Sequence, residues 1–203
     1  MTSKIIEKAR SLFDVAGARR SDTGSYLLIL GLESTVKRNL DEFGHVNGRF
    51  QMYGFARYAG PKLKALIDFI RRQGFTAEPA GRYGYPLEGE INLKTGAIRA
   101  GLGKRGKSSV VLHPAFGARL RFMTLTTDAP MEQLTGREFP DESSPLCEDC
   151  SICIEVCPTG ALVPFRMPDT LLCLSNISPV DKKGRSVLCD KCLHECPANK
   201  NLT

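Results

Sequence analysis

Eight cysteines gather in the last third of this 203-residue chain, and none precedes them. Four follow the pattern C-x2-C-x2-C-x3-C-P, and three of the others form a C-x2-C-x3-C-P run; in order they are Cys147, Cys150, Cys153, Cys157, Cys173, Cys189, Cys192 and Cys196. The first pattern is typical of bacterial [4Fe–4S] proteins, because thiolates on a short looping backbone reach three corners of one cluster. The predicted chemistry is one-electron transfer.

The fourth cysteine of such a run turns away from its own cluster and ligates the other one in two-cluster proteins. The spacing therefore predicts two crossed ligand sets. Cluster one is expected to bind Cys147, Cys150, Cys153 and Cys196, and cluster two is expected to bind Cys157, Cys173, Cys189 and Cys192. All eight cysteines are then used.

Zinc is the alternative metal, because paired C-x2-C units also build structural zinc sites. A single zinc ion would leave half of the thiols without a role, and two would not account for the C-x2-C-x2-C-x3-C-P run. A disulfide framework is typical of secreted chains, but the N-terminus, MTSKIIEKARSLFDVAGARR, lacks a continuous apolar signal stretch. The sequence favours iron–sulfur clusters in a cytoplasmic protein.

A glycine-rich stretch at 101–108, GLGKRGKS, matches both the P-loop and the G-x-G-x-x-G dinucleotide pattern. A P-loop joins a buried strand to the start of a helix, whose amide groups face the phosphates. Here Thr95–Ala100 do not form a buried strand, and Ser109–Leu112 are β-prone and followed by His113-Pro114. Both nucleotide matches therefore fail on their context.

Periodic apolar residues indicate the elements that must position these motifs. Helices are expected over Ser3–Ala16, over the polar segment ending at Phe43, and over Arg49–Arg72 with a break at Gly60-Pro61. Strands are expected over Tyr26–Leu32, Val110–Leu112 and Arg119–Thr127. The predicted fold class is α+β.

The change in composition predicts a division into an α/β domain at 1–130, a linker at 131–145 and a ferredoxin-like two-cluster domain at 146–203. The longest apolar run has the length of a strand, so no membrane span is expected. The net charge of +6 is spread along the chain among 22 acidic residues, and its densest clusters are more typical of solvated loops than of a binding site.

The order of these motifs resembles a known family. The stretch AGLGKRGK at 100–107 runs through SSVVLHPAFGARLRFMTLTTDAP and then reaches CEDCSICIEVCPTGAL and CDKCLHECP. This order is similar to that of the epoxyqueuosine reductases and reductive dehalogenases, which are corrinoid-dependent reductases with two [4Fe–4S] clusters. The resemblance extends from about Lys64 to Asn199, and this chain looks like a short form.

The resemblance implies a nitroreductase-like, truncated N-terminal domain and a corrinoid (cobalamin) that receives electrons from the clusters. By this analogy Gly101, Gly103 and Gly106 let the backbone approach the corrinoid, and Lys107 meets its phosphate or an acidic side chain. The alternative is a tight turn with a solvated lysine. No proton donor is identified; the candidate phenols are Tyr53, Tyr58, Tyr83 and Tyr85.

Two functions remain open at this point. The first is an iron–sulfur reductase that passes electrons to a corrinoid or a bound substrate, which by family analogy is a small molecule or a tRNA. The second is a non-catalytic electron-transfer protein that docks on a larger redox partner. The expected partners are an electron donor such as ferredoxin or flavodoxin and a second copy of the chain.

Overall fold

The structure, a computed structural model, describes residues 2–21, 24–47, 49–81, 91–131, 138–180 and 184–199. The helices are α1 (Thr2–Leu12), α2 (Tyr53–Tyr58), α3 (Gly60–Arg72), α4 (Leu93–Arg99), α6 (Ile152–Glu155), α7 (Thr170–Leu174), α8 (Lys191–His194) and the 3-10 helices η1 (Pro145–Cys147) and η2 (Pro197–Asn199). The strands are β1 (Val15–Arg20), β2 (Tyr26–Glu33), β3 (Glu42–Val46), β4 (Arg49–Gln51), β5 (Ala77–Ala80), β6 (Lys104–Arg105), β7 (Val111–Leu112), β8 (Leu120–Thr127), β9 (Ile177–Pro179) and β10 (Ser186–Leu188).

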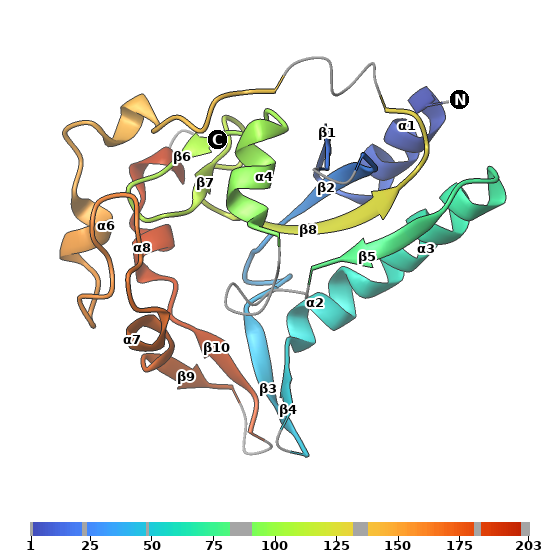
Figure 1. Ribbon diagram of the computed structural model, residues 1–203. Helices are drawn as coiled ribbons and strands as arrows, with labels where there is room; N and C mark the ends of the chain where they lie inside the picture. The colour runs from blue at the N-terminus through green and yellow to red at the C-terminus, as the bar shows by residue number, and fades with distance from the viewer. Residues whose placement is uncertain are drawn as a thin grey trace.

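The main sheet has the strand order β1-β2-β8-β5, and every neighbouring pair in it is antiparallel. Helices cover both of its faces (Figure 1). Leu28, Leu30 and Leu32 of β2 pack with residues of α1 and α3. Ile29 of the same strand packs with Ala97 and Ile98 of α4 on the other face. The apolar run in β2 is therefore unbroken because both sets of alternating side chains are buried.

The mixed α and β content agrees with the predicted fold class, and several expected elements are present. The break expected at Gly60-Pro61 divides α2 from α3, with the proline in the first turn of α3. On α3 the side chains spaced for one helical face are buried; they are Leu63, Leu66, Ile67 and Ile70. A stripe of this kind stabilises a helix mainly through tertiary packing.

Three expected helices differ from the structure. The helix expected from Arg49 begins only at Tyr53, because Arg49–Gln51 form β4 and pair with β3. The N-terminal helix ends at Leu12 rather than Ala16, because Val15 and Ala16 already pair with Gly31 and Leu30 of β2.

The segment that ends at Phe43 is not helical. Its side chains instead bond to the backbone: Ser34 Oγ accepts from the Leu40 amide, and Asn39 Oδ1 accepts from the Asp41 amide. Such local bonds compete with a helix.

A second sheet joins parts of the chain that lie far apart in sequence. Its strand order is β4-β3-β10-β9, so that β3 pairs with β10 from the cysteine-rich segment. Figure 1 shows this sheet below the main sheet, beside α7. Arg185 Nη1 donates to Glu42 Oε1 at 2.7 Å and reinforces the pairing. Within the described ranges, no helix is long and apolar enough to cross a membrane.

The turn between β7 and β8 is closed by His113. The His113 and Gly117 backbones bond to each other in both directions, and His113 Nδ1 accepts from the Ala115 amide at 3.0 Å. Burial lowers the pKa of this imidazole below 6.5. The unfolded chain therefore binds the proton more tightly than the folded chain, so stability is lost as the pH falls through the range just below 6.5.

We expect His113→Asn to flatten the dependence of the unfolding free energy on pH between about 5 and 7, because an asparagine oxygen can accept the same bond and does not titrate. Urea unfolding at several pH values measures it. An equally steep dependence in the variant would assign the acid sensitivity to other groups.

Candidate metal centres

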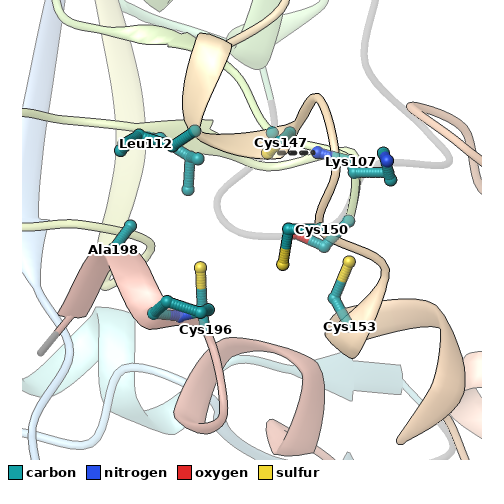
Figure 2. A pocket seen from close by; sticks show the side chains of 11 residues that line it. Lys107, Leu112, Cys147, Cys150, Cys153, Cys196 and Ala198 are labelled. Carbon is teal, nitrogen blue, oxygen red and sulfur yellow. Dashed lines mark hydrogen bonds between the residues drawn. The ribbon is translucent and has the colours of Figure 1, made fainter.

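Four thiols line one cavity of about 100 Å³. They are Cys147, Cys150, Cys153 and Cys196, three of which are buried. Figure 2 shows their sulfur atoms facing the same space. We call this space cavity one. Its thiols come from both cysteine runs, in the combination that the spacing predicts.

Local contacts bring these two runs together. The chain before Cys147 lies along β6, where the Ser144 amide donates to the Arg105 carbonyl at 2.7 Å. Cys196 is followed by η2, in which Asn199 Oδ1 accepts from the Ala118 amide at 2.9 Å. Helices α6 and α8 also contact each other. The first part of the chain therefore supplies the wall against which both runs are fixed.

The other four cysteines line a second, smaller cavity of about 20 Å³, which we call cavity two. They are Cys157, Cys173, Cys189 and Cys192, all half-buried. Cys173 lies on α7, whose first turn is capped by Asp169, and Cys189 directly follows β10.

The thiols interact electrostatically across each cavity. Burial and the charges of neighbouring thiols raise the pKa of Cys192 to about 12. Burial also raises the pKa of Cys153, Cys173 and Cys196. In Cys157 the bonds from Thr159, Ala161 and Leu162 outweigh burial and lower the pKa. Because the four thiols with a raised pKa resist becoming anions alone, a bound cation would favour their thiolate forms.

Each cavity is lined by four thiols, the number of ligands that one [4Fe–4S] cluster or one structural zinc ion takes. Across the described ranges, no group of three or more His, Cys, Asp or Glu side chains is arranged to hold a single metal ion.

Two basic residues near cavity two were not singled out from the sequence. Arg121 on β8 donates to both carboxylate oxygens of Asp41 at 2.7 Å, and its charge interacts with Cys192. Lys94 on α4 has a pKa lowered chiefly by burial, and the charges of Cys173 and Cys192 oppose that shift. No local pattern could reveal them, because α4 and β8 approach the cysteines only in the folded chain.

The glycine loop, residues 101–108, lies between α4 and β7, with β6 inside it. A helix precedes it and a strand follows it, which is the reverse of a P-loop and agrees with rejecting that match. Gly106, Lys107 and Ser108 line cavity one. The Lys107 amide donates to Cys147 Sγ at 3.3 Å. The loop is therefore part of the wall of a cysteine site.

The glycines of this loop face protein atoms. Gly101 has φ +77°, and a Cβ there would lie 2.7 Å from the Phe139 ring. Gly103 has φ +136°, and a Cβ there would overlap the Leu112 carbonyl. A Cβ at Gly106 would lie 2.9 Å from Leu112 Cγ. These contacts give each glycine a reason that lies within the fold, and the Lys107 ammonium bonds to the Glu148 carbonyl at 3.2 Å.

Of the four candidate phenols, the two that the structure describes line neither cavity. The Tyr58 hydroxyl donates to the Lys37 carbonyl at 3.1 Å, and the Tyr53 ring lies against Gly44. Tyr83 and Tyr85 lie outside the described residues.

The chain has the fold of the epoxyqueuosine reductases. A crystal structure of a selenomethionine-labelled epoxyqueuosine reductase matches 98% of this chain and 65% of its own length, with a TM-score of 0.67 and 19% identity. A second epoxyqueuosine reductase structure, with an epoxyqueuosine-modified tRNA-Tyr stem loop, matches with a TM-score of 0.65 over 98% of this chain and 65% of its own, at 18% identity.

Sequence comparison points the same way. The chain is 33% identical to the epoxyqueuosine reductase of Listeria monocytogenes over 55% of its own length and 31% of that protein. It is 30% identical to those of Bacillus subtilis and Cyclobacterium marinum over 68% of its own length and 36% and 46% of theirs. The chain thus spans less than half of these curated relatives. No protein-family model matches it.

Proposed function

We propose that this protein is an iron–sulfur oxidoreductase of the epoxyqueuosine reductase type with two [4Fe–4S] clusters. The observation that carries the proposal is the sorting of eight cysteines into two cavities, each with thiols from both runs. Cys147, Cys150, Cys153 and Cys196 would hold cluster one, and Cys157, Cys173, Cys189 and Cys192 would hold cluster two. When bound, the clusters supply one-electron transfer.

The residues around the cavities would prepare them for anionic clusters. The Lys107 amide donates to Cys147, and hydrogen bonds to sulfur help to set a cluster's potential. Lys94 and Arg121 would direct positive charge toward cavity two. Ala161 and Leu162 are buried and would limit contact with water.

Anaerobic reconstitution tests this proposal. We expect about eight iron and eight sulfide per chain, and [4Fe–4S] signals in electron paramagnetic resonance (EPR) spectra after reduction with dithionite. Zinc bound in preference to iron, or about four iron per chain after complete reconstitution, would contradict two clusters.

A corrinoid is the further cofactor that the resemblance implies. We assign none of the glycine loop to it, because protein atoms already occupy the positions toward which a Cβ at Gly101 or Gly103 would point. The same EPR measurement with cob(II)alamin tests for a site elsewhere. Conversion of the cobalt signal to a protein-bound form would favour a corrinoid-dependent reductase.

The second candidate is an electron carrier that serves a larger partner. Two [4Fe–4S] clusters move electrons one at a time, which is all that a carrier requires. A similar structure contains an epoxyqueuosine-modified tRNA-Tyr stem loop, so an RNA of that kind is the first substrate to offer. Turnover of the stem loop by the reduced protein would support the reductase. Rapid oxidation by redox proteins without turnover would support the carrier.

A further inference from the structure

Lys107 joins the glycine loop to the cysteine-rich segment through three contacts. Its amide donates to Cys147 Sγ at 3.3 Å, and its ammonium donates to the Glu148 carbonyl at 3.2 Å. Its carbonyl accepts from the Phe165 amide at 2.9 Å. Only 9% of the residue is exposed. Figure 2 shows the backbone nitrogen facing Cys147 and the side chain extending to the other side of the loop.

Lys107 differs from its basic neighbours in the group that its charged end contacts. Lys104 is half-exposed and pairs with Glu142, and Arg105 pairs with Asp141. Lys107 forms no ion pair with the part of the chain that the structure describes, and its ammonium bonds to an uncharged carbonyl. A residue that lines cavity one therefore carries a positive charge that no carboxylate of the described residues neutralises.

A cation and an amide donor beside a cluster favour its reduced state. A [4Fe–4S] cluster with four thiolates is an anion and gains a further negative charge when one electron enters. Net charge and hydrogen bonds to sulfur are among the factors that set its potential, and charges in a partly buried site interact more strongly than in water. The ammonium also fixes the loop to Glu148, the residue after Cys147, and so holds the amide in line with the sulfur.

We propose that Lys107 is a positioning residue that raises the reduction potential of cluster one. This inference rests on the proposed two-cluster function. It gives the lysine of the glycine loop a role that needs no phosphate or corrinoid.

The test compares Lys107→Met, which removes the charge, with Lys107→Arg, which keeps it, and with Lys104→Met as a control in the same loop. All are made in the full chain and reconstituted anaerobically, and iron content is measured first. EPR-monitored redox titration then gives the potential of each cluster. The cluster-one signal is assigned from Cys173→Ala, in which only cavity one keeps four thiols.

In Lys107→Met we expect at least a tenfold shift of the cluster-one equilibrium toward the oxidised state, a potential lower by 59 mV. Lys107→Arg and Lys104→Met should stay near the wild type, and cluster two should not shift. Selective loss of cluster one in Lys107→Met, with recovery in Lys107→Arg, would also support the role.

An unchanged cluster-one potential in Lys107→Met, or an equal shift of both clusters, would overturn the inference. Loss of both clusters in both lysine variants would also overturn it. A wild-type chain that binds no clusters would instead refute the proposed function itself, and the iron assay detects that case before any titration.

Discussion

Replacing Cys196 with alanine should remove the same cluster as replacing Cys150, although the two cysteines belong to different runs. Both line cavity one, whereas Cys157 and Cys189 line cavity two. A [4Fe–4S] cluster that loses a thiolate ligand loses affinity and its characteristic spectrum. Each single variant should therefore fall from about eight to about four iron atoms per chain, measured after anaerobic reconstitution and desalting.

Double variants test the crossed assignment directly. Cys150→Ala with Cys196→Ala should lose no more iron than either single change, because both affect one cluster. Cys150→Ala with Cys157→Ala should lose nearly all iron, although both cysteines lie in the first run. The reverse pattern, in which the pair from one run keeps a cluster and the crossed pair does not, would assign each run to its own cluster. The effects of two substitutions add when they act on independent sites and do not add when they act on the same site.

Gly103→Ala is expected to destabilise the metal-free protein by about 4 kcal/mol, from backbone strain and overpacking together. Gly103 has φ +136°, and its new Cβ would lie 2.8 Å from Val111 Cγ1 and overlap the Leu112 carbonyl. Backbone atoms cannot move aside as the end of a flexible side chain can. Chemical denaturation of the metal-free chain measures the effect without any cofactor.

Gly74→Ala is the matched control. Gly74 also has a positive φ, +88°, but nothing lies within 4 Å of the position that a Cβ would take. Its cost should be only the left-handed backbone penalty of about 1–2 kcal/mol. If metal-free Gly103→Ala were as stable as the wild type and lost only cobalamin binding, Gly103 would serve a ligand rather than the fold.

The four thiols that line each cavity are the four that the cysteine pattern assigns to one cluster, because the fourth cysteine of such a run turns away from the first three. That each set holds a cluster stays a prediction. The sequence also predicted the interior strand at Tyr26–Leu32 and the buried stripe of α3, since both produce strong periodic signals. The wrong helix before Phe43 has a physical cause. Apolar and polar residues there suit a helix, but Ser34 and Asn39 bond to the backbone in a way that periodicity does not record.

The position of the glycine loop could not be read from its own residues. Its pattern suggests phosphate binding. Its environment is instead set by contacts with Phe139, Leu112 and Cys147, which form only when the chain folds. The pairing of β3 with β10 was missed for the same reason. Three-residue strands such as β10 carry little periodic signal, and their pairing depends on tertiary contacts.

The pairing of β3 with β10 also sets the order in which a newly made chain can fold. Strand β3 emerges early from the ribosome together with its neighbour β4. Its other edge cannot pair until Ser186–Leu188, which form β10, have been synthesised. Contacts of such large sequence separation form late, because a long loop must close before they contribute. Cys189 follows β10 immediately, so closing this sheet also delivers a thiol to cavity two. Completion of cavity two is therefore expected to be among the last steps of biogenesis.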